Sequence, residues 1–248
     1  MEYVELLRVR RGLITFAVAN LCFFLAATFA LHGHGGFHIK FDLDKTGSSL
    51  GDFITAAGVG ALFLATFFAG HLAAETPTLP FLWTKPVPRT VLAWRYAAID
   101  AGAMFAGVAI GTLALLALVA GMGQADRVRL DAEVLPALAL SVGAPLAWYG
   151  LCLLAASRFD RDVANSVVAL SWPVFLFVFM LSIIALPPQA HAVAVFLNQF
   201  DPLSYIIGSE HHDRGLISAS PAVRAAAVWV IGIASIAAAT RVWTTRDG

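Results

Sequence analysis

Residues Ala97–Met122 read AAIDAGAMFAGVAIGTLALLALVAGM, and Asp100 is the only charged side chain in this run. A helix that crosses the hydrocarbon core of a bilayer needs about 20 consecutive, mostly apolar residues. We therefore expect this run to cross a membrane. Five further runs have the same character, at residues 13–31, 53–72, 134–156, 167–186 and 225–242.

The composition supports a membrane protein. The chain has 248 residues, of which 59% are hydrophobic and 13% are charged, whereas soluble domains carry about 25% charged residues. The connections between the apolar runs are too short for a soluble domain. We expect one all-α integral membrane domain over residues 1–248, with six transmembrane helices and the two cysteines, Cys22 and Cys152, buried inside spans.

The start of the chain has two interpretations. Arg8, Arg10 and Arg11 precede the first apolar run, as in a signal peptide. That run is longer than the 7–15 apolar residues typical of signal peptides, so we expect a retained anchor. Residues 2–11 alternate apolar and charged side chains, which suits either an interfacial helix or a plain basic flank.

The distribution of basic residues predicts the orientation. With the N-terminus in the cytoplasm, ten of the 16 Lys and Arg residues lie inside. The cytoplasmic loops of membrane proteins carry an excess of these residues. We therefore expect both termini of this multi-pass protein to be cytoplasmic. The membrane that we expect is a bacterial-type cytoplasmic (inner) membrane.

Two stretches between the spans are unusual. Residues 75–95 read ETPTLPFLWTKPVPRTVLAWR, a short amphipathic run held between prolines. It suits a segment that lies on the cytoplasmic surface and docks into another protein, although an interfacial helix without a partner is an alternative. Residues 190–208 are long enough to span, but Asp201 and Pro202 lie in their middle. A carboxylate at mid-bilayer costs about 2.5–3.5 kcal/mol, so we expect a re-entrant element on the extracytoplasmic side.

This order of elements resembles the type 2 permease subunits of ATP-binding-cassette (ABC) exporters. Members of that family carry a glutamate after the second span, then Gly-Thr-Leu, an apolar stretch, Pro-Val and a base. The matching residues here are Glu75, Thr78, Leu79, Phe81, Leu82, Trp83, Pro86, Val87 and Arg89, with Pro77 in place of the glycine and Pro80 and Pro88 additional. A second family feature, Pro-Leu-Thr/Ser-Tyr before the last span, matches Pro202-Leu203-Ser204-Tyr205, which follow Asp201.

The resemblance implies a function for both stretches. Residues 75–92, with Lys85 among them, would form a coupling helix that sits in a groove of an ATPase subunit. Asp201, Pro202, Leu203 and Tyr205 would belong to an extracytoplasmic gate.

The resemblance also implies partners. The sequence has no Gly-x-x-x-x-Gly-Lys-Ser/Thr phosphate-binding loop and no catalytic motif, so ATP and Mg would bind a separate nucleotide-binding subunit. A second permease half, identical or similar, would complete the transporter. We expect membrane lipids as further partners, no nucleic acid, no cofactor on this chain, and an amphiphilic or hydrophobic substrate such as a lipid, drug or peptide.

Other residues leave alternatives open. For Asp100 we favour snorkelling to the interface or pairing with a base over contact with a substrate. Gly107 and Gly111 form a weak small-residue pattern for close helix packing. Histidines cluster at His32, His34 and His38 and again at His211 and His212, most simply as solvated loops and not as a metal site. A haem- or metal-handling permease and a non-transporting scaffold or sensor remain the alternative functions.

Overall fold

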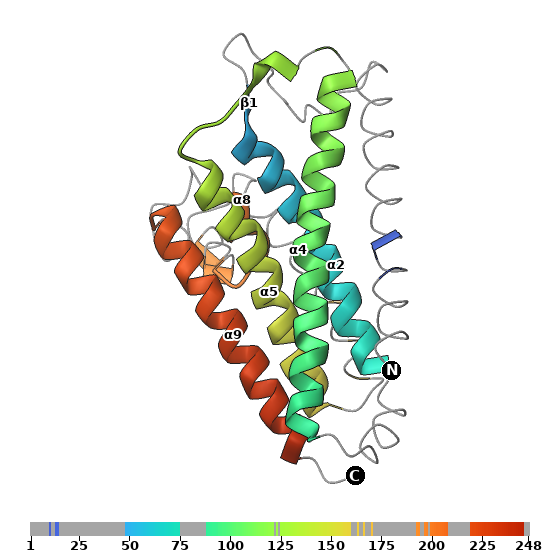
Figure 1. Ribbon diagram of the computed structural model, residues 1–248. Coiled ribbons are helices and arrows are strands. Elements are labelled where there is room, and N and C mark those ends of the chain that lie inside the picture. The colour runs from blue at the N-terminus through green and yellow to red at the C-terminus, as the bar shows by residue number, and fades with distance from the viewer. Residues whose placement is uncertain are drawn as a thin grey trace.

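The computed structural model describes residues 48–74, 88–121, 123, 125–159, 199–207 and 219–245, with isolated positions in 10–14, 163–170 and 192–197. At residues 48, 70–74, 89, 127 and 207 only the backbone is described. This part of the chain is mostly helical (Figure 1). Its long helices are α2 (Leu50–Ala74), α4 (Arg89–Gly121), α5 (Val134–Arg158) and α9 (Pro221–Thr245).

All four long helices are long and apolar enough to cross a membrane. They overlap the runs at 53–72, 97–122, 134–156 and 225–242, where the sequence predicts spans. The predicted spans at 13–31 and 167–186, and the interfacial helix before residue 12, fall almost entirely outside the described residues. The structure thus supports a multi-pass, all-α membrane protein.

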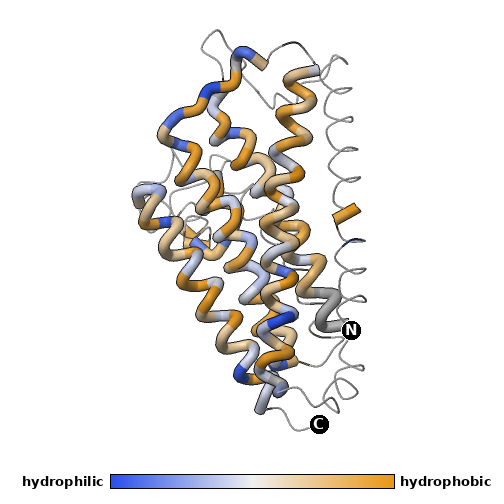
Figure 2. Tube along the Cα trace, viewed as in Figure 1, coloured by the Kyte–Doolittle hydropathy of each residue, from blue (hydrophilic) through white to orange (hydrophobic). Residues whose placement is uncertain are grey.

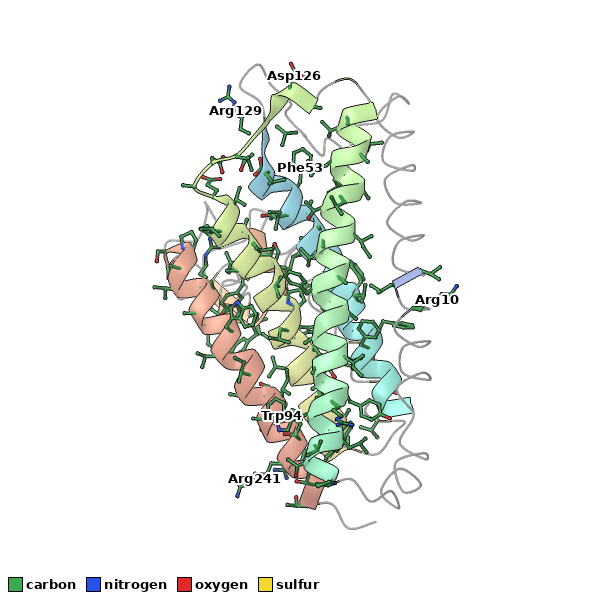
Figure 3. The ribbon with its side chains drawn as sticks, in the orientation of Figure 1. Arg10, Phe53, Trp94, Asp126, Arg129 and Arg241 are labelled. Carbon is green, nitrogen blue, oxygen red and sulfur yellow. The ribbon has the colours of Figure 1, made fainter. Side chains whose placement is uncertain are left out.

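The direction of the helices gives the bundle two ends. Helices α2, α5 and α9 run the same way, and α4 runs against them (Figure 1). We call the end where α2 and α5 begin and α4 stops the acidic end, because the charged side chains described there are four acids and one base: Asp52, Asp126, Asp131, Glu133 and Arg129. We call the other the arginine end; the charged side chains described there belong to Arg95, Arg158 and Arg241, and Figure 3 labels Arg241.

The segments at the acidic end are short. Strand β1 (Ser48–Ser49) pairs in parallel with β2 (Val128–Arg129), which follows the 3-10 helix η2 (Ala125–Arg127). The Ser49 hydroxyl donates to Asp131 Oδ1 at 2.8 Å, which joins the start of α2 to the loop before α5. Polar residues gather here, while the helices are largely hydrophobic along their length (Figure 2).

Helices α2 and α5 touch at the level of their backbones. A Cβ atom added to Gly58 would lie 2.4 Å from Ser141 Cβ and 2.7 Å from Ser141 Cα. Only glycine fits on α2 at this crossing. Inside membranes, small residues allow such close approach and replace the hydrophobic driving force that acts in water.

Helices α5 and α9 make a second backbone contact. A Cβ added to Gly150 would lie 2.8 Å from the Gly232 carbonyl oxygen, and one added to Gly232 would lie 3.0 Å from the Ala147 nitrogen. Towards the acidic end from this contact, the Trp229 indole N–H donates to the Ala139 carbonyl at 3.0 Å. Helix α5 is therefore in close backbone contact with α2 on one side and with α9 on another.

Helix α4 packs less tightly. A Cβ added to Gly111 would meet Ala57 Cβ of α2 at 3.1 Å, whereas one added to Gly102 would meet nothing within 4 Å. The predicted Gly107-Gly111 packing face is thus seen at Gly111, against α2. The opposite face of α4 exposes large apolar side chains, including Phe105 and Leu113.

We predict that Gly58→Ala destabilises the protein, while Gly102→Ala does not. Both substitutions gain the same helix propensity, up to about 1 kcal/mol, so their difference isolates the contact with Ser141. Overpacking of this kind costs about 1–3 kcal/mol. Thermal unfolding of the purified protein in detergent measures both, and equal melting temperatures for the two variants would contradict the close crossing.

Candidate functional site

The predicted coupling residues lie mostly outside the described part of the chain. This holds for Glu75, Thr78, Leu79, Phe81, Leu82, Trp83, Lys85, Pro86 and Val87. The description resumes at Pro88, whose carbonyl accepts the Leu92 N–H at 3.1 Å. Arg89 begins α4, which is continuous through Ala97, so residues 89–92 belong to the same helix as the span.

The ends of α2 and α4 fix where this segment is attached. Helix α2 stops at Ala74 and α4 begins at Arg89, both at the arginine end (Figure 1). Trp94 and Arg241 also lie at this end (Figure 3). Residues 75–88 therefore connect two helices on the side of the bundle where exposed arginines gather.

The predicted gate residues lie in or just before α8 (Pro202–Ile207), a helix too short to span a membrane. Asp201, Pro202, Leu203 and Tyr205 are all buried. Asp201 caps α8: its Oδ1 accepts the Leu203 N–H at 2.9 Å, and its Oδ2 accepts the Ser204 hydroxyl at 3.4 Å. Burial raises the pKa of the Asp201 carboxyl to about 6, although these two hydrogen bonds oppose the shift.

A base from α9 holds the other end of α8. Arg224 Nη1, in the first turns of α9, donates to the Tyr205 carbonyl at 3.3 Å. The Tyr205 hydroxyl turns back and donates to the Gln199 carbonyl at 2.9 Å. A base near its C-terminus complements the dipole of α8. The gate block is therefore packed and hydrogen-bonded, not a loose loop.

Asp100 lies deep in the bundle. Its side chain is 0% exposed, and its Oδ2 accepts the Tyr149 hydroxyl of α5 at 2.8 Å. Eleven residues separate it from Arg89 at the start of α4, which corresponds to about 16 Å of helix. The expectation that Asp100 snorkels to the interface is wrong, because α4 begins eight residues before the predicted span and Asp100 turns towards α5.

A second polar pair lies beside the first. The Trp148 indole N–H donates to the Thr66 hydroxyl of α2 at 2.7 Å, and that hydroxyl donates to the Leu62 carbonyl at 3.1 Å. Adjacent residues of α5 thus reach two different helices, Trp148 to α2 and Tyr149 to α4. The sequence analysis missed both aromatic residues; a tryptophan and a tyrosine in mid-span, far from the interfaces they usually prefer, are the signal that could have found them.

Two other expectations concern cysteine and metal chemistry. Cys152 is buried in α5, as predicted, while Cys22 lies outside the described residues. Among the side chains that the structure describes, no group of three His, Cys, Asp or Glu residues could hold a metal ion. The histidines at 32, 34, 38, 211 and 212 are not among them.

No family model, no curated protein and no solved structure matches this chain.

We predict that Tyr149→Phe destabilises the protein by about 1–3 kcal/mol, because it leaves a buried carboxylate without one of its donors. In an Asp100→Leu background the same substitution should cost much less. A double-mutant cycle on thermal or denaturant unfolding measures this coupling. If Tyr149→Phe cost the same in both backgrounds, the hydrogen bond would contribute nothing to stability.

We predict that stability falls as the pH rises from about 4 to 6. The folded-state pKa of Asp201 is raised from 3.8 to about 6, so the neutral carboxyl is the form that the fold prefers. Its contribution is complete below the unfolded pKa and is lost as the pH rises through the folded pKa. Asp201→Asn keeps an N-cap acceptor but cannot titrate, so the melting temperature of this variant should depend less on pH over this range. If the melting temperature depended on pH as in the parent, the pH dependence would not come from Asp201.

Proposed function

We propose that this chain is the permease half of an ATP-driven exporter of the ABC type 2 class, which moves an amphiphilic or hydrophobic substrate out of the cytoplasm or the inner leaflet. The observation that carries the proposal is the place of residues 75–88. They carry the coupling pattern of Glu75, Thr78-Leu79 and Pro86-Val87, and they join α2 to α4 at the arginine end.

The charge of the two ends supports a cytoplasmic location for this segment. Among the described side chains, Arg95, Arg158 and Arg241 are exposed at the arginine end, whereas four acids and one base lie at the other. An excess of basic residues marks the cytoplasmic side. With the arginine end in the cytoplasm, residues 75–88 can meet an ATPase.

The gate block is consistent with the same orientation. Helix α8 is tied to the first turns of α9 through Arg224, and α9 stops at the arginine end. The Pro202-Leu203-Ser204-Tyr205 block therefore lies on the part of the bundle away from the coupling segment. In this orientation α8 is extracytoplasmic, where it would close the exit.

The buried polar groups bear on the class of substrate. Asp100 is the one acid buried within a span of the described residues, and Tyr149 already donates to it. The large exposed side chains of the four long helices are apolar in their middle parts, such as Phe63, Phe105 and Ile233. A pathway lined by such helices suits a lipid-like molecule better than an ion.

We predict that the protein, expressed together with an ATPase subunit encoded beside it, co-purifies with that subunit. Trp83→Ala combined with Leu79→Ala should reduce the recovery at least tenfold, because large apolar anchors of a docked helix carry most of its binding energy. Quantitative mass spectrometry of the purified complex measures the ratio of the two chains.

Leu130→Ala is the matched control, since Leu130 is 82% exposed at the acidic end and should leave the ratio unchanged. Failure to recover an ATPase with the parent chain, together with no effect of the double substitution on export, would overturn the proposal.

A further inference from the structure

The three exposed arginines at the arginine end lie at one level of the bundle. Arg241 is six residues beyond Ser235, which contacts Gly150 of α5; six residues beyond Gly150 is position 156, two before Arg158. The same height can be found on α2, because Gly58 of α2 lies beside Ser141 of α5. Position 156 is fifteen residues beyond Ser141, and fifteen residues beyond Gly58 is position 73.

The level reaches α4 through the contact of Ala57 with Gly111. Because α4 runs against α2, sixteen residues beyond Ala57 correspond to sixteen residues before Gly111, which is Arg95. Arg95, Arg158 and Arg241 therefore form a belt, within about one helical turn of the same height, on α4, α5 and α9.

The belt is exposed, and its guanidinium groups are unpaired within the described part of the chain. All three side chains are exposed, and none of their guanidinium groups has an ion pair or a hydrogen bond in the described structure. Next to Arg95, Trp94 is 43% exposed at the same end (Figure 3). An exposed tryptophan beside arginines marks the headgroup region of a bilayer.

The depth of the belt agrees with that region. Helix α5 extends from Val134 to Arg158, which is about 36 Å, between a hydrocarbon core of about 30 Å and a full bilayer of about 40–45 Å. When α5 spans the membrane, Arg158 lies just outside the hydrocarbon, where lipid phosphates lie. Arginine binds phosphate through paired N–H donors.

We propose that Arg95, Arg158 and Arg241 form a belt that binds the headgroups of anionic phospholipids in one leaflet only. Among the described side chains, the acidic end offers no such belt, because four acids, Asp52, Asp126, Asp131 and Glu133, stand there against the single base Arg129. The bound lipids would fix the height of the helices at the end where the proposed coupling segment acts. The proposal does not depend on the transport function, because the belt needs only the bundle and a membrane.

Lipid retention by the purified full-length chain tests the proposal. The protein is mixed in detergent with equal amounts of phosphatidylglycerol and phosphatidylcholine of the same acyl chains, and native mass spectrometry counts the retained lipids. Each base near an anionic surface favours it by about fivefold, so we expect phosphatidylglycerol to exceed phosphatidylcholine at least fivefold. The triple variant Arg95→Gln, Arg158→Gln, Arg241→Gln should retain the two lipids about equally.

Arg129→Gln is the matched control, because Arg129 is an exposed arginine at the acidic end; it should behave as the parent. A second measurement, on the parent protein alone, does not require the triple variant to fold. About 0.5 M salt should reduce the preference of the parent for phosphatidylglycerol, since salt screens exposed charges.

Equal retention of both lipids by the parent would overturn the proposal, as would a preference that the triple variant keeps or that Arg129→Gln loses. A triple variant that keeps its lipid preference but no longer recovers an ATPase would assign the belt to a protein partner instead. Loss of the lipid preference with normal ATPase recovery supports the belt and leaves the proposed function untouched.

Discussion

The backbone contact of α5 with α2 on one side and α9 on the other is the constraint from which the rest of the bundle follows. Gly58 faces Ser141, and Gly150 and Ala147 face Gly232, at distances where a larger side chain on any of the three glycines would collide. Contacts this short fix the height and the direction of three helices relative to one another. In a bilayer this packing must come from shape, because lipid tails are as apolar as the side chains they surround.

Once α5 is fixed, its polar side chains can be satisfied only at specific partners. Trp148 donates to Thr66 of α2, and Tyr149 donates to Asp100 of α4. Helix α5 therefore supplies the hydrogen-bond donors to both of these neighbours. The same crossing leaves one group unsatisfied. The Ser141 hydroxyl is buried without a partner in the described structure, and Pro145 has no N–H to donate to the Ser141 carbonyl. The crossing with α2 is therefore the polar weak point of α5.

Hydropathy predicts which segments are helices, because a bilayer selects for length and apolarity. It is less able to predict where they begin. Helix α4 starts at Arg89, not at Ala97, since the turns that carry Trp94 and Arg95 are helical but amphipathic. Hydropathy also cannot predict which side chains bind each other. Tyr149 and Asp100 are 49 residues apart, and neither segment contains a pattern that indicates the other as its partner. The burial of Asp201 was equally hidden, because a re-entrant element can leave such a carboxyl either solvated or packed.

The rigidity of this core bears on how the bundle could transmit motion under the proposed function. A displacement applied to residues 75–88 enters at two points, the end of α2 and the start of α4. Helix α2 cannot move alone, because its contact with Ser141 is at the backbone and α5 in turn carries α9. Helix α4 packs along α2 through apolar side chains, with one close contact at Gly111, and leaves Gly102 without neighbours. The Tyr149–Asp100 hydrogen bond ties it to α5, but no described backbone contact as short as those of α5 holds it. The segment therefore joins a rigid three-helix unit to a more loosely held helix, and a pull on it acts first on the angle between α4 and that unit.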